Sequence, residues 1–372
     1  MSQSQSTMRL LLISLFAALA GAQPVVQDLF TAGEQGYMTY RIPGLFAQGK
    51  TVLAYAEARR DGFGDWADID VVMRRSTDGG RTWAPMRVLA DAGTGTANNP
   101  VAIPGAKPGE IHFLYCVDYA RAFHMRSTDG GATFSKPVEI TAAFERLRAV
   151  YDWNVIAAGP GHGIRLRNGR LLAAVWLSTG GKKHRPSRVG TLYSDDNGLT
   201  WQTGDLVPDT LPNPSETYAV ELRDGRVMLN IRNESPEHRR ALSFSSDGAR
   251  AWSKPVFDQQ LLEPVCMASL IRHPKGALLF SNPDNLEATY VDASQTVNRD
   301  RKNLTVQWSG DDGKTWTAKR VLEAGLSGYS DLAAISDGTI LCLYERGGLD
   351  KNIFRAGRLS VARFSERWVK GR

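Results

Sequence analysis

Thiols, metal-ligand patterns and long apolar runs are all scarce in this sequence of 372 residues. Its three cysteines are too few for a scaffold held together by disulfides. Each cysteine lies inside an apolar stretch, where a free thiol usually packs as a small buried hydrophobe. The six histidines are scattered and make no zinc-ligand spacing with the cysteines. We therefore expect no metal, no other cofactor, and core positions for Cys116, Cys266 and Cys342.

A strong charge of one sign and long amphipathic helical patterns are also missing. Lys and Arg number 45 against 39 Asp and Glu, a formal charge of +6. This diffuse basic excess mildly favours anionic partners and does not indicate nucleic acid. The composition is otherwise that of a globular protein, which excludes a disordered, collagen-like or coiled-coil chain. The length allows two domains or one large fold built from repeats.

Residues 1–22 have the pattern of a secretory signal peptide. A polar start ends at Arg9, an apolar run follows from Leu10 to Ala20, and an A-x-A cleavage motif precedes Gln23. The apolar run is too short for a stable membrane span, and no later stretch is longer. We expect a secreted or periplasmic protein that starts near Gln23 and has no membrane span.

One octet of the form S-x-D-x-G-x-x-aromatic, or a close variant, recurs five times. Its Asp accepts local backbone hydrogen bonds, its Gly supplies a positive φ, and its aromatic packs beneath a turn between antiparallel strands. The spacings of 51, 67, 51 and 64 residues leave room for one four-stranded sheet per copy. The copies are STDGGRTW at 76–83, STDGGATF at 127–134, SDDNGLTW at 194–201, SSDGARAW at 245–252 and SGDDGKTW at 309–316.

Strand-like segments flank the octets, and radial repetition of small sheets is typical of a β-propeller. The sequence therefore predicts an all-β, six-bladed β-propeller with Asp-box turns, in which one blade lacks a recognisable octet. Strand-like segments near residue 30 and at 358–364 predict that the two ends of the chain share a blade. Residues 23–372 then form a single domain, expected to be a monomer, and the octets themselves carry no chemistry.

An ordered set of motifs runs through the same chain. YRIPGL at 40–45 is followed by AEAR, GDW, RRS, GPGHG, LNIRN, an R-x-x-x-T segment, GYSDL and LYE. From about residue 28 to 365 the chain resembles the exo-α-sialidases. The resemblance implies a catalytic domain that hydrolyses terminal sialic acids from glycoproteins, glycolipids or oligosaccharides with retention and without a cofactor. The alternatives are a trans-sialidase, a Kdn-preferring sialidase, or a noncatalytic propeller that binds sialoglycans.

The resemblance implies that Arg41, Arg232 and Arg301 hold the sialic acid carboxylate. Guanidinium groups stay charged and match a carboxylate bidentately, so three of them converging from separate blades would orient the sugar. Arg299 competes for the third place. Arg301 is preferred because it has the R-x-x-x-T spacing to Thr305.

The resemblance also implies Tyr329 of GYSDL as the nucleophile and Glu216 as its base. The anomeric carbon of sialic acid bears a carboxylate, so a neutral phenol avoids the repulsion that an attacking carboxylate would meet. A phenol with an ordinary pKa near ~10 needs an adjacent base. Glu221 lies an odd number of residues from Glu216 and so on the other face of a strand, where a structural role is expected.

Several aspartates crowd the segment that should hold the general acid/base. Counting back from Arg74 and Arg75 selects Asp65, in the glycine-rich DGFGDW loop. Asp68 and Asp70 begin an alternating strand, where a structural ion pair is expected. Five residues before Asp65, Arg60 resembles the family arginine near the O4 edge of the sugar, with Arg59 as its rival.

Supporting positions complete the expected site. Glu345 of LYERG is expected to brace Arg41 and to offset the repulsion among the arginines. Trp66 and Trp153 are expected either to line the pocket or to pack in the core or rim. His162 of GPGHG is expected to stabilise a turn. The segment NNPVAIPGAKPG departs from the family in lacking an acid shortly after Asn-Pro.

Overall fold

The computed structural model describes residues 22–292, 295, 297–352 and 354–371. The predicted signal peptide at 1–22 therefore lies almost entirely outside the described residues. The described chain is all-β apart from three short helical segments, and none of its helices is long and apolar enough to cross a membrane. The helical segments are η1 (Thr141–Ala149), η2 (Leu349–Lys351) and α2 (Glu366–Val369).

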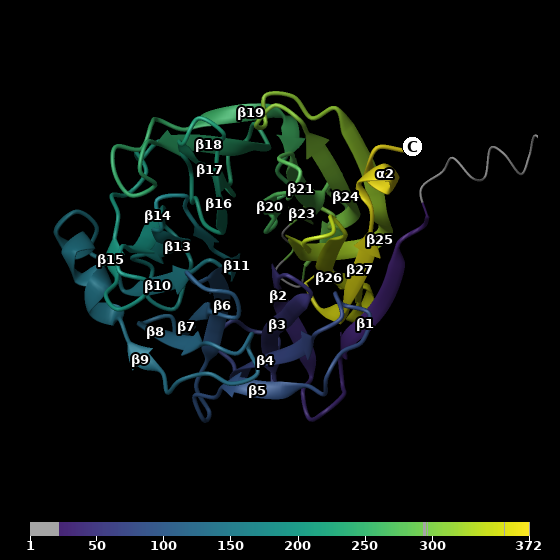
Figure 1. Cartoon of the computed structure of the whole chain (residues 1–372), viewed down its shortest axis with the longest axis horizontal. Coiled ribbons are helices and arrows are strands. Elements are labelled where there is room, and N and C mark those ends of the chain that lie inside the picture. The colour runs from purple at the N-terminus through teal and green to yellow at the C-terminus, as the bar shows by residue number, and fades with distance from the viewer. Residues whose placement is uncertain (1–21, 293–294, 296, 353, 372) are drawn as a thin grey trace, which may run out of the picture.

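Four sheets of four or five strands follow one another along the chain and stand around a central axis (Figure 1). The first contains β2 (Thr39–Gln48), β3 (Thr51–Arg59), β4 (Ile69–Ser76) and β5 (Arg87–Ala90). The second contains β6 (Ala97–Pro104), β7 (Ile111–Val117), β8 (Arg121–Ser127), β9 (Val138–Glu139) and β11 (Gly161–His162). The third contains β10 (Val155–Ala158), β12 (Ile164–Arg165), β13 (Leu171–Ser178), β14 (Ser187–Ser194) and β15 (Gln202–Thr203). The fourth contains β16 (Thr217–Glu221), β17 (Val227–Ile231), β18 (Arg239–Ser245) and β19 (Val256–Leu262).

A seven-stranded sheet with the order β1-β27-β26-β25-β24-β21-β20 completes the ring. β1 pairs with β27, so the two ends of the described chain share a sheet, which confirms the prediction made from the terminal segments. The strands are β20 (Ser269–Arg272), β21 (Leu278–Pro283), β24 (Lys302–Ser309), β25 (Ala318–Ala334), β26 (Ile340–Gly348), β27 (Ala356–Phe364) and β1 (Val25–Thr31). A separate two-stranded sheet contains β22 (Tyr290–Val291) and β23 (Val297–Asn298).

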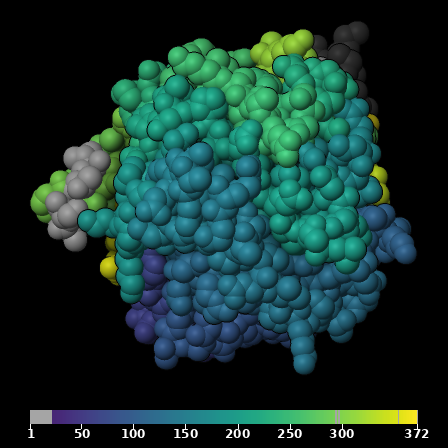
Figure 2. Space-filling view, turned by 90° about the vertical axis from the view of Figure 1, so that its left-hand side faces the viewer, coloured from purple at the N-terminus to yellow at the C-terminus, as the bar shows by residue number. Residues whose placement is uncertain are grey.

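The core lies between neighbouring sheets. One apolar cluster joins Leu172 and Trp176 of β13 to Val227 and Leu229 of β17, so it fills the space between the third and fourth sheets. Similar clusters lie between the other neighbouring sheets. A further cluster joins the two halves of the seven-stranded sheet. In a side view the middle of the chain, coloured blue to green, forms one continuous outer wall (Figure 2). All three cysteines are buried and free, as predicted.

The octets form the turns that their composition predicts. In the second copy, Asp129 accepts hydrogen bonds from the backbone N–H (2.9 Å) and hydroxyl (2.7 Å) of Thr133, and these bonds lower the pKa of Asp129 to about 2. Ser127 accepts from the N–H of Gly131 at 2.8 Å. Gly131 has a φ of 78°, and a Cβ there would lie 2.8 Å from Leu53 of the first sheet. The octet is therefore a turn that also packs against the neighbouring sheet.

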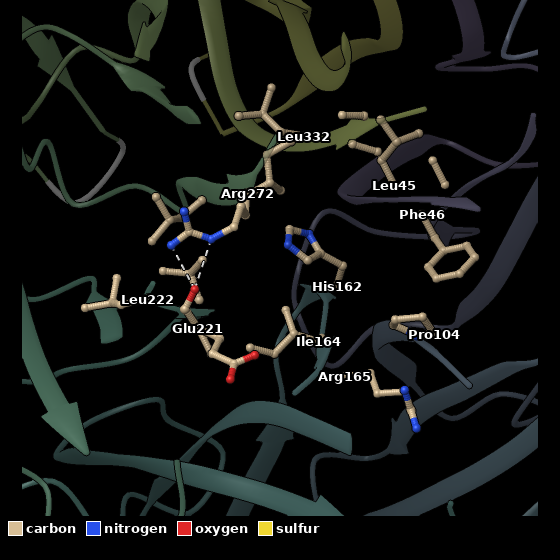
Figure 3. A pocket seen from close by; sticks show the side chains of 18 of the residues that line it. Leu45, Phe46, Pro104, His162, Ile164, Arg165, Glu221, Leu222, Arg272 and Leu332 are labelled. Atoms are coloured by element: carbon tan, nitrogen blue, oxygen red, sulfur yellow. Dashed lines mark hydrogen bonds between the residues drawn. The ribbon is translucent and has the colours of Figure 1, made fainter. Parts of the chain in front are cut away.

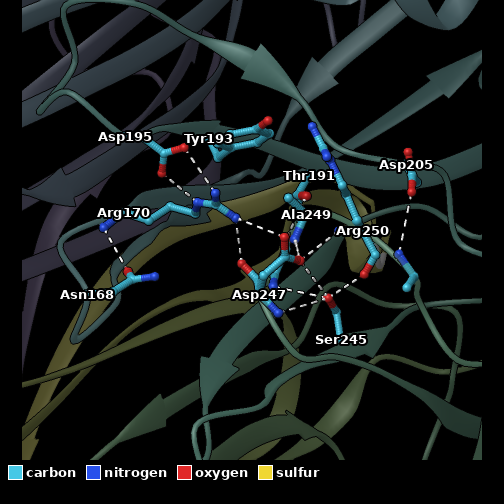
Figure 4. Close-up of polar contacts among 12 residues, drawn as sticks. Asn168, Arg170, Thr191, Tyr193, Asp195, Asp205, Ser245, Asp247, Ala249 and Arg250 are labelled. Carbon is cyan, nitrogen blue, oxygen red and sulfur yellow. Dashed lines mark hydrogen bonds and ion pairs between the residues drawn. The ribbon is translucent and has the colours of Figure 1, made fainter.

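The fourth octet is tied to the third sheet by charged groups (Figure 4). Arg170, just before β13, donates to the carbonyl of Asp247 at 2.8 Å and pairs with Asp195 at 2.7 Å. Ser245 of the octet accepts from the N–H of Gly248 at 3.1 Å. These contacts link successive sheets and include none of the predicted site residues.

Candidate active site

A cavity of about 190 Å³ lies where the ends of several inner strands meet. Strand β2 contributes Arg41, Glu216 precedes β16, Arg232 follows β17, Arg301 precedes β24 and Tyr329 lies in β25. Side chains separated by up to 288 positions in sequence are thus brought together from three sheets. The cavity is lined by Arg41, Ile42, Asp65, Asn99, Tyr119, Trp176, His184, Arg185, Ser187, Asn213, Ser215, Glu216, Arg232, Glu234, Arg301, Tyr329 and Phe354.

Tyr329 and Glu216 form a buried hydrogen-bonded pair. The phenol donates to Glu216 Oε1 at 2.6 Å, and Arg232 Nη1 donates to the phenol oxygen at 2.7 Å and pairs with Glu216. Burial raises the pKa of Glu216, but Arg232 and the phenol outweigh it and hold that pKa below its ordinary value. Burial also raises the pKa of Tyr329 well above its ordinary value, despite the arginines. The resting pair is therefore a neutral phenol beside an ionised carboxylate.

Three guanidinium groups surround the Tyr329 ring. The Cζ atoms of Arg41, Arg232 and Arg301 lie 5.0, 5.9 and 5.0 Å from the ring centroid. Glu345 accepts from Arg41 Nε at 2.9 Å and from the backbone N–H of Tyr329 at 3.1 Å. Glu345 therefore holds both an arginine of the cluster and the backbone of the tyrosine, a wider contact than the brace expected for Arg41 alone.

The local geometry of YRIPGL explains how Arg41 reaches the cavity. The pairing of β2 with β3 shifts register between Arg41 and Gly44, and Ile42 adopts a φ of 57°. A Cβ at Gly44 would lie 2.0 Å from the ring of Tyr55, so only glycine fits beside this tyrosine. The motif is thus an irregularity of an inner strand that turns an arginine toward the axis.

Only one of the two candidates for the third arginine lines the cavity that holds Tyr329. Arg301 is 6% exposed, donates to the carbonyl of Val265 at 3.0 Å, and lines the same cavity as Tyr329. Arg299 donates to the carbonyl of Leu286 at 2.8 Å and lines a neighbouring cavity. The structure therefore brings Arg301, and not Arg299, to the tyrosine.

Asp65 lies at the rim with its side chain 33% exposed. It pairs with Arg59 at 2.7 Å and lies 3.7 Å from His184 Nδ1. Burial raises the pKa of Asp65, but the charges of Arg59 and then Arg41 outweigh it and leave that pKa below its ordinary value. Arg59 is fully buried and also pairs with Glu57 at 3.0 Å, so it fixes the carboxylate of Asp65.

The structure corrects the prediction that Arg60 lies at the edge of the bound sugar. Its side chain turns away from the cavity, stacks over Tyr37 at 4.6 Å, and pairs with Asp68 at 3.6 Å and with buried Asp70. The physical reason is that Arg59 and Arg60 are consecutive at the end of β3, and consecutive side chains of a strand point to opposite faces. Asp68 and Asp70 have the structural pairing that was expected.

Neither predicted tryptophan is among the residues lining the cavity. Trp66 packs behind its wall, 4.7 Å from Tyr119 and 4.8 Å from His184 between ring centroids. Trp153 is 2% exposed and sits under Arg148, whose Cζ lies 3.7 Å from its ring, and beside Phe144. The expectation of substrate contact is therefore corrected to core packing for Trp153 and to support of the wall for Trp66.

Sequence reasoning missed an aromatic wall and several polar residues of the cavity. Tyr119, Trp176 and His184 pack on one another from separate segments, with ring centroids 5.3 to 6.0 Å apart. Burial lowers the pKa of His184 despite Asp65, which favours a neutral imidazole at neutral pH. No local motif marks these three residues. Asn99 also lines the cavity and has a φ of 52°. The Asn-Asn-Pro run is the one sequence feature that could have drawn attention to it.

A second cavity, of about 440 Å³ and mostly apolar, lies at the opposite ends of the same inner strands (Figure 3). His162 points into it, and its Nδ1 lies 2.7 Å from Oδ1 of buried Asp331. This pair joins β11 to β25, a long-range contact in addition to the turn that His162 was expected to stabilise. Glu221 lines this second cavity and pairs with Arg167 at 3.0 Å, in keeping with the structural role expected for it.

Comparisons with known proteins agree on one family. Residues 49–342 match the family model described as a BNR repeat-like domain. A sialidase of Micromonospora viridifaciens is 33% identical, with 88% of this chain and 53% of that protein covered. A sialidase of Bacteroides fragilis is 29% identical (84% and 61% covered), and mouse sialidase-3 is 29% identical (92% and 94% covered). The chain thus spans little more than half the length of these two bacterial relatives.

Solved structures give the same result. The Hadza microbial sialidase Hz136 superposes with a TM-score of 0.75 at 26% identity, covering 93% of this chain and 69% of that one. Trypanosoma rangeli sialidase in complex with the inhibitor DANA has a TM-score of 0.71 at 18% identity, covering 93% and 60%. At that identity the trypanosomal structure supports the fold alone.

Proposed function

Because the chain belongs to the sialidase family, with a BNR repeat-like domain over residues 49–342, we propose that it is an exo-α-sialidase. It removes terminal sialic acids from glycoproteins, glycolipids or oligosaccharides. The observation that carries the proposal is the phenol of Tyr329, hydrogen-bonded to Glu216 and surrounded by three arginines. A carboxylate-bearing sugar fits this arrangement because the three guanidinium groups can bind its carboxylate beside the phenolic oxygen that attacks.

Substrate binding rests on the arginine cluster. The sugar carboxylate accepts hydrogen bonds from the guanidinium groups of Arg41, Arg232 and Arg301. Glu345 keeps Arg41 in place. The bidentate geometry of guanidinium groups fixes the sugar with its anomeric carbon toward Tyr329. Arg59 is fully buried and acts through Asp65, whose carboxylate it holds at the rim of the cavity.

Chemistry then proceeds in two displacements with net retention. In the first, the phenolic oxygen of Tyr329 bonds to the anomeric carbon while its proton passes to Glu216. The bond to the aglycone breaks, and Asp65 gives its proton to the leaving oxygen. In the second, Asp65 takes a proton from water, whose oxygen displaces Tyr329, and the phenol recovers its proton from Glu216. The substrate carboxylate offsets the charges of Arg41 and Arg59, which raises the pKa of Asp65 toward the value an acid needs.

The fold that supports this site is proposed to have six blades. In the seven-stranded sheet, residues 318–326 of β25 pair with β24, whereas residues 327–334 pair with β26. This long strand is thus the outer strand of one blade and the inner strand of the next. The seven-stranded sheet then counts as two four-stranded blades that share β25, which with the four other sheets makes six. We further propose that residues 23–372 form a single catalytic domain, secreted or periplasmic after removal of residues 1–22, and that the protein is a monomer.

The first test is hydrolysis of a fluorogenic α-sialoside and of sialyllactose, followed by proton NMR. We expect free sialic acid to appear first as the α-anomer, because two displacements retain configuration. Initial release of the β-anomer would contradict the tyrosine mechanism. Binding without release would support a noncatalytic propeller, and transfer to added lactose would support a trans-sialidase.

The substitution Asp65→Ala tests whether Asp65 is the general acid. We expect kcat/KM for sialyllactose to fall by about 10²–10⁴-fold, because its sugar leaving group needs a proton. The loss for a 4-nitrophenyl sialoside should be much smaller, because that leaving group departs without one. Asp61→Ala, in the same loop, is the control and should affect both substrates equally little. Equal losses for the two substrates in Asp65→Ala would contradict its role as the acid.

A further inference from the structure

A third cavity, of about 550 Å³, adjoins the candidate active site. The two cavities share Arg185, Arg232, Glu234, Arg301 and Phe354, so a molecule bound at Tyr329 can extend from one to the other. The additional lining residues of the third cavity are His238, Pro264, Val265, Ala288, Asn298 and Arg299.

Positive charge exceeds negative charge in this cavity. Four arginines line it, against one carboxylate, Glu234. Glu234 is engaged, since it pairs with Arg185 and accepts from Asn213 at 2.8 Å. Arg232 is offset by Glu216. Among the described residues, the arginines of this cavity without a carboxylate partner are therefore Arg301, which belongs to the proposed carboxylate cluster, and Arg299.

Arg299 has no carboxylate partner among the described residues. Two nearby carboxylates are engaged elsewhere: Asp300 accepts from the backbone N–H of Thr289 at 2.8 Å, and Glu287 pairs with Lys302. Arg299 donates instead to the carbonyl of Leu286 and to Nε2 of His238.

His238 adds no compensating charge. Burial, followed by the charges of Arg299 and Arg239, lowers the pKa of His238, so its imidazole is neutral at neutral pH and accepts from Arg299. Phe354 supplies an apolar face beside these groups. It stacks under Arg301 at 4.8 Å and meets Tyr290 edge-on at 5.7 Å. The cavity thus combines a guanidinium that has only neutral partners among the described residues with an aromatic wall, which suits an anionic sugar.

We propose that this cavity is a subsite for the sugar next to the terminal sialic acid, and that Arg299 binds a carboxylate on that sugar. The inference rests on the proposed sialidase function and deepens it. Substrates with an acidic penultimate sugar, such as a second sialic acid, are preferred over those with a neutral one. A neutral sugar offers the guanidinium no opposite charge, whereas an acidic one forms a charge-assisted hydrogen bond with it.

The experiment compares two forms of α2,8-linked disialyllactose that differ at one group, the carboxyl of the inner sialic acid. One has a free inner carboxylate, and the other has that group converted to the methyl amide. For the wild-type protein we expect kcat/KM to be about tenfold higher for the free acid, the scale of one charge-assisted hydrogen bond. The ratio should fall at 0.5 M NaCl, because salt screens a part-exposed charge pair.

Arg299→Ala should bring this ratio close to one, and Arg299→Gln provides a second variant if the first folds poorly. The matched control is Arg239→Ala, which removes the same charge from the arginine next to His238. Arg239 is not among the residues that line the cavity, and among the described residues it donates to backbone carbonyls, including that of Gln259 at 3.2 Å. It should keep the wild-type ratio.

The outcomes separate the subsite from the proposed function. A wild-type ratio near one, or an unchanged ratio in both Arg299 variants, would overturn the subsite while the sialidase activity stands. Failure of the wild-type protein to cleave either compound or a fluorogenic α-sialoside would overturn the proposed function and the subsite together.

Discussion

Replacing Tyr329 with Phe is expected to lower kcat for a fluorogenic α-sialoside by at least about 10³-fold, the scale seen when a catalytic nucleophile is removed. The substitution deletes the one oxygen that accepts from Arg232 and donates to Glu216, and keeps the ring that the arginines surround. An unsaturated sialic acid analogue should still bind with a similar Kd, because its carboxylate contacts the arginines. Calorimetry and initial rates measure the two effects.

Tyr344→Phe is the matched control for this substitution. Tyr344 is also buried, and it pairs across β25 and β26 with Ser330, the residue that follows Tyr329. It is not among the residues that line the cavity. We expect turnover close to that of the wild type in this variant. Turnover of Tyr329→Phe at the wild-type rate would rule out the tyrosine as nucleophile, and loss of analogue binding would show that the ring itself is needed for the arginine cluster.

Glu263→Ala is expected to lower the free energy of unfolding by about 3–5 kcal/mol, because it leaves a buried guanidinium without its charge partner. Arg240 and Glu263 are both fully buried, and their ion pair lies beneath the site. Burial lowers the pKa of Arg240 and raises the pKa of Glu263, so each depends on the other to stay charged. Denaturant titration measures the loss.

The Arg240 pair also bears on the site itself. Arg240 Nε donates to Asn230 Oδ1 at 2.7 Å, and Asn230 lies two positions before Arg232. Glu263→Ala should therefore also weaken binding of the unsaturated analogue.

Two variants test the origin of this loss of stability. The double substitution Arg240→Met with Glu263→Leu removes both charges and should restore most of the stability, because it leaves no unpaired ion. Glu139→Ala breaks an exposed pair with Arg121 and should leave the unfolding transition nearly unchanged. A loss in the double variant as large as in the single one would attribute the effect to packing and not to charge.

Much of the fold was predictable because its signals are local. The Asp, Ser and Gly of each octet bond within one turn, so their spacing alone indicates where two strands meet. The motif YRIPGL is local as well, since Gly44 is required by the ring of Tyr55 across one strand pair. The pairing of β1 with β27 was predictable from strand-like ends, because a closed ring must join them.

The sequence by itself determined the all-β class and the repeat, and its family resemblance supplied Tyr329, Glu216, Arg41 and Arg232 as candidate site residues. Their arrangement depends on which strand ends meet at the axis, and only the tertiary structure decided it. Arg59 and Arg60 are adjacent in sequence but point to opposite sides: Arg59 holds Asp65, whereas Arg60 pairs with Asp70. The aromatic wall with His184 and the cavity with Arg299 are likewise tertiary. Turn chemistry acts between near neighbours in sequence, whereas a pocket depends on distant segments whose side-chain directions no local pattern records.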